Sequence, residues 1–289
     1  MEEIRRFGVV GGDLRQRYLA GRLAGRGYQV TAFLLGEELP PSVSMGGSLE
    51  QLGEMDGVIL PLPVSADGLT VNTPLDRRQA TLEKLVHSLR PGTLVLGGKV
   101  SPALRERLAQ KGCPVEDYLQ REEMAVMNTI PTAEGAIATA MEELPVTLFG
   151  CRCLITGYGR VARMLAQDLR GLGAQVTVAA RRHDALAWAE IAGCRAVSLE
   201  ALDDVLPSAQ VLFNTIPAAV LGEEQLSRLS QDCLVIDLAS KPGGVDFTTA
   251  ARLGIRAVWA LSLPGKAAPI TAAEIIKDTI LNIIAERGR

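Results

Sequence analysis

The chain has 289 residues, of which 47% are hydrophobic and 22% charged, and its formal net charge is −3. This length suits two domains of ordinary size, and the composition is typical of a folded globular protein. The slightly acidic balance argues against a nucleic-acid partner, and no run of about 18 apolar residues predicts a membrane span.

The N-terminus and the cysteines favour a cytoplasmic protein. Residues 1–6 lead directly into an apolar strand pattern, without the longer apolar stretch of a signal peptide. Five cysteines are scattered along the chain, most of them in apolar segments, where cysteine commonly fills small spaces in a core. Cys151 and Cys153 form the only close pair, but nothing nearby supplies two more metal ligands, so we expect no metal site.

The first half of the chain alternates short apolar runs with helical patterns, which favours a parallel sheet covered by helices. The pattern predicts strands at 7–11, 28–35, 58–60 and 93–97, and helices at 14–24, 75–89 and 103–111. Residues 119–142 have a helical pattern that Pro131 interrupts, so we predict two helices that meet at this proline.

The second half repeats the alternation from Cys151 onward. The pattern predicts strands at 151–156, 175–180, 211–214, 234–238 and 256–259, and helices at 160–172, 184–192 and 271–285. The fold class is therefore α/β, with two Rossmann-like domains built on parallel sheets. We expect the C-terminal helix to pack back on the N-terminal domain. Residues 1–145 with 271–289 would then form the first domain, and residues 146–270 the second.

A glycine-rich turn is predicted between the first strand and the first helix of the second domain. Gly157, Gly159 and Ala162 give it the spacing G-x-G-x-x-A. Gly157 allows a tight turn, Gly159 lets the backbone approach a pyrophosphate, and Ala162 lets the helix lie close to the strand. We expect the segment Gly157-Tyr158-Gly159-Arg160-Val161 to bind a nicotinamide dinucleotide at the helix N-terminus. The alternative is a glycine turn in an α/β domain that binds no ligand.

The residues after the next strand favour NADP over NAD. An NAD enzyme usually has an Asp or Glu there, whereas this chain has Arg181, Arg182 and His183. A guanidinium pairs with a 2′-phosphate, which a carboxylate would repel. The alternative is that the two arginines only begin a solvated helix, and His183 could equally lie on the surface.

Two later strands of this domain end in segments that we expect at the cofactor, because ligands of parallel α/β sheets bind at the carboxyl ends of strands. The first segment is Asn214-Thr215-Ile216-Pro217, which should run beside the riboses. The second comprises residues 237–243, which should lie near the nicotinamide and which include Lys241.

Polar residues of the first half also fall at predicted strand ends and helix starts. Asp13 and Arg15 follow the first strand and are expected to face a cleft between the domains, although Asp13 could instead cap a helix. Lys266 lies in a Pro-Gly-Lys loop that should bridge the domains, with a plain surface turn as the alternative. Further candidates in such positions are Lys99, Asn128, Thr132 and Glu134.

Histidine usage excludes some chemistry, since only His87 and His183 are present. A 2-hydroxy-acid dehydrogenase of the familiar kind needs a histidine base late in the chain, and this chain has none there. Hydrolysis by a serine or cysteine with a histidine base is equally poorly supported.

Several motifs follow one another in a specific order along nearly the whole chain. They are Gly11-Gly12-Asp13-x-Arg15-Gln16, Gly97-Gly98-Lys99, residues 128–135, Gly157-Tyr158-Gly159-Arg160-Val161, residues 214–217, and residues 263–269. Taken together they resemble the family of dipicolinate synthase A subunits from spore-forming bacteria. The resemblance implies an NADP-linked oxidation of dihydrodipicolinate, from the branch point of lysine synthesis, to dipicolinate for sporulation. It also implies a partner, the flavoprotein-like B subunit, together with a place in the mother-cell cytoplasm, and we expect a homo-oligomer.

Such a substrate is a dicarboxylate, which cations bind and hydroxyl groups orient. Arg15, Lys99, Lys241 and Lys266 are the expected cations, with Asn128 and Thr132 as further substrate-binding residues. Loss of a ring proton requires a base, for which Asp13, Glu134 and a neutral Lys99 are the candidates.

Two other functions fit the same features. One is an NADP-dependent dehydrogenase of another small carboxylic acid. The other is a non-catalytic NADP-binding partner that regulates or supports the B subunit. Turnover by the isolated chain would distinguish an enzyme from such a partner.

Overall fold

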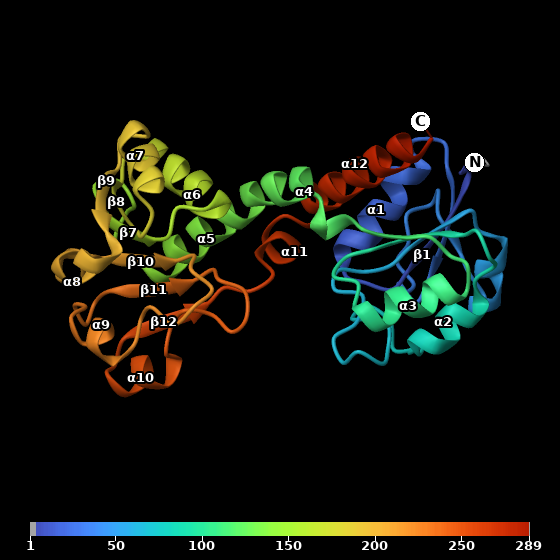
Figure 1. The fold of residues 1–289 in the computed structure, drawn as a ribbon, viewed down its shortest axis with the longest axis horizontal. Helices are drawn as coiled ribbons and strands as arrows, with labels where there is room; N and C mark the ends of the chain where they lie inside the picture. The colour runs from blue at the N-terminus through green and yellow to red at the C-terminus, as the bar shows by residue number, and fades with distance from the viewer. Residues whose placement is uncertain (1–3, 289) are drawn as a thin grey trace. The chain divides into compact units, whose positions relative to one another are not determined.

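The computed structural model describes residues 4–288, which form two six-stranded parallel sheets (Figure 1). The chain divides into two units, one of Met1–Asn128 with Ala268–Arg289 and one of Thr129–Ala267. Each unit contains one sheet with helices on both faces, so the predicted α/β fold with two Rossmann-like domains is confirmed.

The first unit has the strand order β3-β2-β1-β4-β5-β6. The strands are β1 (Arg6–Val10), β2 (Gln29–Phe33), β3 (Ser44–Met45), β4 (Gly57–Ile59), β5 (Leu94–Gly97) and β6 (Val115–Asp117). One face packs against α1 (Leu14–Ala24), α4 (Glu122–Met127) and α12 (Pro269–Arg287). The other face packs against α2 (Leu82–Ser88) and α3 (Pro102–Gln110).

The second unit has the same topology, with the order β9-β8-β7-β10-β11-β12. The strands are β7 (Arg152–Thr156), β8 (Gln175–Ala180), β9 (Arg195–Ser198), β10 (Val211–Asn214), β11 (Leu234–Asp237) and β12 (Arg256–Trp259). One face packs against α5 (Thr129–Glu143), α6 (Arg160–Gly171) and α7 (His183–Ile191). The other packs against α8 (Leu202–Val205), α9 (Glu223–Ser227) and α10 (Phe247–Arg252).

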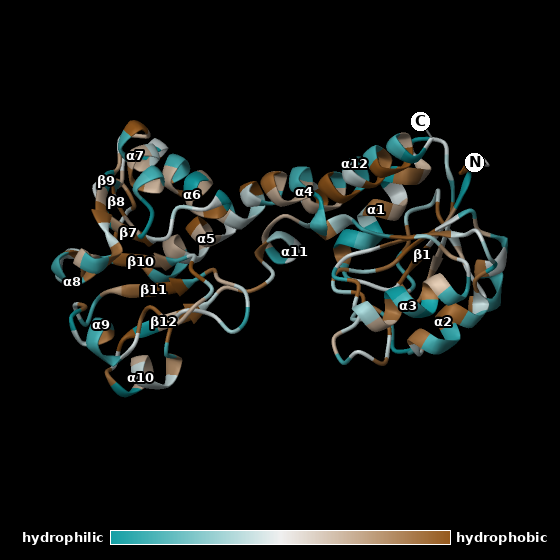
Figure 2. Ribbon diagram, viewed as in Figure 1, coloured by the Kyte–Doolittle hydropathy of each residue, from teal (hydrophilic) through white to brown (hydrophobic). Residues whose placement is uncertain are grey.

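The central strands are strongly hydrophobic, and Figure 2 shows this clearly for β10 and β11. Helices on both faces bury alternate side chains of a strand in opposite directions, which explains the nearly continuous apolar runs. Phe213 and Leu212, adjacent in β10, are both fully buried but belong to different apolar clusters.

The C-terminal helix packs on the first unit, as predicted. Ile276, Ile280 and Ile283 of α12 are buried in the same apolar cluster as Leu19 and Leu23 of α1, and Figure 1 shows the two helices side by side. The isoleucines recur at helical spacing, so one stripe of α12 faces the core of the first unit.

The structure corrects the predicted boundary between the domains. It divides the chain after Asn128 rather than after residue 145, because α5 packs on α6 of the second unit. The predicted pair of helices exists, but the break is at Asn128 and not at Pro131. Pro131 lies in the first turn of α5, where a missing N–H group costs the helix no hydrogen bond.

Other elements also differ from the prediction. The helix predicted at 75–89 is confined to Leu82–Ser88, where Thr81 caps its N-terminus, and the preceding residues are irregular. The sequence pattern also missed the short strands β3, β6 and β9. These edge strands have few residues and little apolar periodicity, so tertiary pairing decides their existence.

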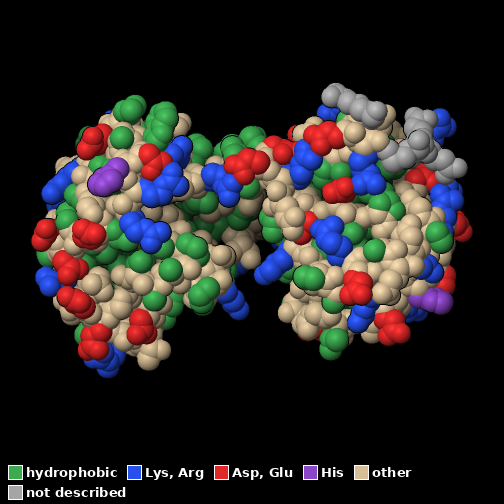
Figure 3. All heavy atoms as spheres, viewed as in Figure 1, with side chains coloured by type: hydrophobic (Ala, Val, Ile, Leu, Met, Phe, Trp, Pro, Cys, Tyr) green, Lys and Arg blue, Asp and Glu red, His purple; other side chains and the backbone are tan. Residues whose placement is uncertain are grey.

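The surface gives no sign of a strongly charged field on the face drawn in Figure 3, where acidic and basic side chains are interspersed. Between residues 4 and 288 we find no helix with both the length and the apolar character that crossing a membrane requires. All five cysteines are buried, and none of them forms a disulfide bond.

Candidate functional site

The glycine turn between β7 and α6 has the geometry of a dinucleotide-binding loop. Gly157 has a φ of 87°, and a Cβ atom there would lie 2.6 Å from Thr215 Oγ1, so only glycine fits. Gly159 is the N-cap of α6, and a Cβ atom added to it would meet nothing within 4 Å. Ala162 is fully buried between α6 and the sheet. The turn therefore leaves open space in front of the helix N-terminus, where a phosphate can bind.

A pocket of about 710 Å³ opens over this turn. Its walls come from the turn itself, the end of β8, the start of α7 and the segment after β10. The lining residues are Gly157, Tyr158, Gly159, Arg160, Arg163, Ala180, Arg181, Arg182, Asp184, Ala185, Leu199, Ile216, Ala218, Ala219 and Val220. The strand ends of a parallel sheet thus meet at one site, as the sequence predicted for the cofactor.

The end of β8 presents the two predicted arginines differently. Arg181 and Arg182 are both exposed and both line the pocket. The Arg182 guanidinium forms a bidentate ion pair with Asp184, in which Nε donates to Oδ1 over 2.8 Å. Arg182 precedes α7, so its local role matches the alternative of a helix start. Arg181 has no such carboxylate partner within the described part of the chain.

Asn214 and Thr215, which were predicted beside the riboses, are not among the residues that line the pocket. The Asn214 side chain is fully buried, accepts from Thr156 Oγ1 over 2.7 Å and donates to Asp237 Oδ1 over 2.8 Å. The Thr215 hydroxyl donates to the Thr156 carbonyl. Ile216 lines the pocket, whereas the exposed Pro217 is not among the lining residues. The residues after Pro217, Ala218 to Val220, complete this wall and were not predicted.

Asp237 anchors the segment that follows β11. Its carboxylate is fully buried and accepts hydrogen bonds from Asn214 Nδ2, the Ala239 N–H and the Gly244 N–H, at 2.8 to 3.0 Å. Trp259 Nε1 donates to the Ala239 carbonyl over 3.0 Å. These contacts fix both ends of the loop that presents Lys241, whose side chain is exposed.

Lys266 lies in a helix rather than in the predicted bridging loop. Helix α11 (Leu263–Ala267) belongs to the second unit and packs on α5 at Gly135, where an added Cβ atom would lie 3.1 Å from Leu263 Cβ. Lys266 itself is exposed on this short helix. The small residue at position 135 therefore serves helix packing.

The segment at 128–134 is divided between the units. Asn128 is the C-cap of α4, whereas Thr132 and Glu134 belong to α5. Glu134 therefore lies in the second unit and not, as predicted, in the N-terminal domain. Burial raises the pKa of Asp168 of α6, and the negative charge of Glu134 adds to this effect.

Asp13 and Arg15 of the first unit bind each other. Asp13 caps α1 by accepting from the Arg15 N–H, and Arg15 Nη2 donates to Asp13 Oδ2 and to the Leu62 carbonyl, both over 2.7 Å. Arg15 is only 7% exposed. The alternative of a helix cap thus describes Asp13 in this structure, and Arg15 is committed to internal contacts.

Lys99 is held in an unusual backbone conformation after β5. Its φ is 62°, which is rare for a residue other than glycine and is typical of functional sites. The buried Asp117 carboxylate stabilises this turn by accepting from the N–H groups of Lys99 and Val100. The Lys99 side chain is exposed and lines a pocket of about 330 Å³ with Ser65 and Ser101.

Gln16 is a polar residue whose importance the pattern of strand ends did not reveal. It is fully buried on α1, and an added Cβ atom at Gly12 would lie 2.5 Å from its Oε1 atom. Its amide makes no hydrogen bond within the described residues. Its packing against Gly12 places this residue of the Gly11-Gly12-Asp13-x-Arg15-Gln16 motif in the same strand-end region.

Comparison with known proteins agrees with this division of the chain. Residues 6–119 match the model of the N-terminal domain of the dipicolinate synthase A subunit. Residues 124–241 match the NAD-binding domain of D-isomer specific 2-hydroxyacid dehydrogenases. The second match identifies a dehydrogenase-type domain that binds a nicotinamide dinucleotide, as expected from the glycine turn.

Full-length relatives extend this similarity over the whole chain. The chain is 30% identical to the A subunit of dipicolinate synthase from Bacillus subtilis (strain 168), over 97% of its own length and 96% of the relative's. The crystal structure of the A subunit from Bacillus halodurans superimposes with a TM-score of 0.89 at 29% identity, covering 97% of this chain and 98% of that one. The crystal structure from Bacillus subtilis gives a TM-score of 0.87 at 27% identity, with 99% and 97% covered.

Proposed function

Because this chain belongs to the family of dipicolinate synthase A subunits, we propose that it oxidises dihydrodipicolinate to dipicolinate with NADP⁺ as the electron acceptor. The observation that carries the choice of cofactor is the end of β8. There Ala180 is followed by Arg181, and no acidic residue stands where an NAD enzyme binds the ribose hydroxyls. The open space at Gly159 and the N-terminus of α6 accommodate the pyrophosphate.

The proposed reaction removes two electrons and two protons from the ring. A bound nicotinamide would accept the hydride that a ring carbon loses, and a base of the protein would take the remaining proton. The dihydropyridine thereby becomes an aromatic pyridine. Because aromatisation favours the products, the protein's main tasks are to bind both carboxylates and to hold the ring in one orientation.

Lys99 is the first residue to test in the chemistry. Its side chain is exposed while its backbone is fixed in a left-handed turn by Asp117. Asp13 and Glu134 are the other proposed bases, although Asp13 is paired with Arg15. For the substrate carboxylates we propose Lys241 and Lys266 before Arg15, because both lysines are exposed and Arg15 is buried. Asn128 and Thr132 remain proposed orienting residues.

We further propose that this chain forms a homo-oligomer that works with a B subunit in the mother-cell cytoplasm of a sporulating bacterium. The names of the relatives support the partner in this proposal, since they identify each relative as one kind of subunit of dipicolinate synthase.

The test mixes the purified chain with NADP⁺ and freshly generated dihydrodipicolinate, with and without the B subunit. NADPH formation and dipicolinate absorbance are followed together. The proposal predicts equal amounts of both products, and loss of both in Lys99→Ala with NADP⁺ binding retained. If NADP⁺ binds but neither product forms even with the B subunit, the chain is a binding partner or acts on another acid.

A further inference from the structure

Arg163 is an arginine of the dinucleotide pocket that the glycine motif does not include. It lies near the start of α6 and lines the same pocket as Arg181 and Arg182. The N-terminus of α6 faces the pyrophosphate position, whereas Arg163 contacts α7, the helix that begins directly after those two arginines. Its guanidinium therefore lies on the adenosine side of the pocket.

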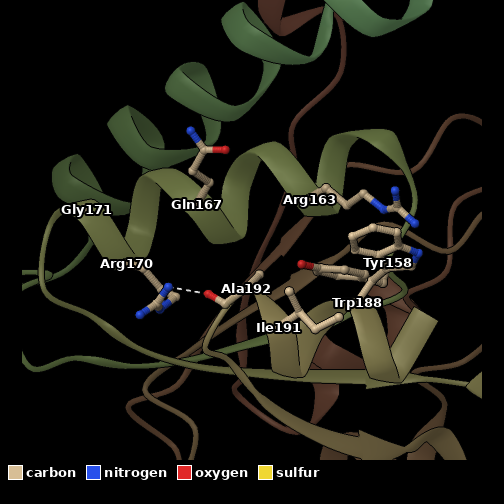
Figure 4. Close-up of a pocket in the computed structure, with 8 residues that line it drawn as sticks. All are labelled: Tyr158, Arg163, Gln167, Arg170, Gly171, Trp188, Ile191 and Ala192. Carbon is tan, nitrogen blue, oxygen red and sulfur yellow. Dashed lines mark hydrogen bonds between the residues drawn. The ribbon is translucent and has the colours of Figure 1, made fainter. Parts of the chain in front are cut away.

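Two aromatic rings hold Arg163 in place. Its Cζ atom lies 5.5 Å from the centroid of Tyr158 and 5.6 Å from that of Trp188, and Figure 4 shows the guanidinium beside both rings. Tyr158 is buried, and burial raises the pKa of its phenol, so the ring stays neutral. Stacking on ring faces fixes the plane of a guanidinium while leaving its N–H groups free for an anion.

No carboxylate in residues 4–288 forms an ion pair with Arg163, whose recorded contacts are the two aromatic rings. Arg182 differs in this respect, and Arg170 has its guanidinium committed to a backbone carbonyl. Arg182 is paired with Asp184, and the Arg170 guanidinium donates to the Ala192 carbonyl at the end of α7. A phosphate entering the pocket would thus find a positioned, uncompensated charge at Arg163.

We infer that Arg163 is a specificity-determining residue that binds the 2′-phosphate of NADP together with Arg181. Trp188 and Tyr158 act as positioning residues for its guanidinium. This inference rests on the proposed function in one respect, the choice of NADP, and does not depend on which acid is oxidised. Arg163 and Arg181 then recognise the 2′-phosphate, while Arg182 stays paired with Asp184.

The test compares two ligands that differ only in the 2′-phosphate, namely 2′,5′-ADP and 5′-AMP, by isothermal titration calorimetry on the full chain. Arg163→Gln should weaken 2′,5′-ADP about tenfold, as expected for loss of one charge-assisted contact, and leave 5′-AMP within about twofold. Arg170→Gln is the matched control, since Arg170 lies on the same helix and shares an adjoining groove with Arg163 but does not line the dinucleotide pocket, and it should change neither affinity.

Two substitutions of Trp188 test whether its ring positions Arg163. Trp188 is 54% exposed, so its replacement should leave the fold intact. Trp188→Leu should weaken 2′,5′-ADP selectively, and Trp188→Phe, which keeps an aromatic face, should restore most of the affinity. Equal weakening of both ligands in Arg163→Gln, or no weakening, would overturn the inference.

The same titrations separate this inference from the proposed reaction. If the unaltered chain binds 2′,5′-ADP no better than 5′-AMP, both the choice of NADP and the role of Arg163 are wrong. If the preference exists and Arg163→Gln abolishes it, while no dipicolinate forms in the turnover assay, the inference stands and the proposed reaction fails.

Discussion

Asp237 shows how a single buried carboxylate organises the strand ends. Three N–H donors surround it, from Asn214, Ala239 and Gly244, and none of these donors carries a charge. Asn214 extends the network to Thr156 of β7, so side chains at the ends of three adjacent strands are linked. A buried charge is tolerated here because hydrogen-bond donors of the protein surround both of its oxygens.

Replacing this carboxylate should destabilise the second unit. In Asp237→Asn one acceptor oxygen becomes an amide donor, which must face an N–H group that it cannot bind. We expect the free energy of unfolding to fall by about 2 to 4 kcal/mol, measured by urea titration. Asp232→Asn, at an exposed site, is the control and should change it by less than about 0.5 kcal/mol. Equal effects in the two variants would contradict this interpretation of the network.

The two arginines after β8 should contribute unequally to NADP⁺ binding. Arg181→Ala should raise the Kd for NADP⁺ at least about tenfold, because it removes an uncompensated guanidinium. Arg182→Ala should raise it less, because Asp184 already neutralises that side chain. Asp184→Asn should lower the Kd by releasing Arg182. The Kd for NAD⁺ serves as the control, and a larger effect of Arg182→Ala than of Arg181→Ala would refute this ranking.

At the scale of elements, the turn between β7 and α6 combines two glycines with different constraints. Gly157 is required by the fold, since its φ is 87° and Thr215 occupies the space of a side chain. Gly159 has an ordinary φ of −80° and open space around it, so the fold alone would accept alanine. The need for glycine at 159 therefore comes from the ligand.

Alanine substitutions should separate these two constraints. Gly157→Ala should lose both stability, by about 1 kcal/mol or more, and dinucleotide binding. Gly159→Ala should keep the stability of the unaltered chain and lose affinity for the dinucleotide, because its methyl group would project into the pocket. Thermal unfolding with and without NADP⁺ measures both effects. Unchanged NADP⁺ affinity in Gly159→Ala would show that the pyrophosphate binds elsewhere.

At the scale of the whole molecule, each unit has its own apolar cores. Each of the four buried clusters among the described residues lies within a single unit. The C-terminal helix α12 follows the second unit in sequence but completes the core of the first. Both tryptophans, Trp188 and Trp259, belong to the second unit, so their fluorescence reports on that unit alone.

A cavity under α12 should therefore affect one unit selectively. Ile276 is fully buried against the first unit, and Ile276→Ala should destabilise it by about 2 to 5 kcal/mol. Circular dichroism should then show an earlier loss of helix, while the tryptophan transition stays where it was. NADP⁺ should raise only the tryptophan transition, since the pocket lies in the second unit. Ile270→Ala, at an exposed position on the same helix, is the control. A joint shift of both signals would mean that the units unfold together.

The amino-acid sequence by itself determined the elements whose periodicity is strong and the turn whose spacing is diagnostic. Central strands such as β7 and β10, the helices α1 and α6, and the apolar stripe of α12 follow from apolar runs and helical spacing. Gly157 and Gly159 follow from local backbone constraints, and Arg181 from its place directly after a strand. These features were predictable because each depends on neighbours close in sequence.

Only the tertiary structure decided which polar groups are available to a ligand. Asn214 and Arg15 were predicted to bind ligands, yet one completes a network with Thr156 and Asp237 and the other pairs with Asp13. The boundary after residue 128 likewise depends on the packing of α5 against α6. Arg163 was recognised as a candidate binding residue only in the tertiary structure, where it lies over the rings of Tyr158 and Trp188. Such outcomes depend on contacts between residues distant in sequence, which composition, spacing and periodicity do not encode.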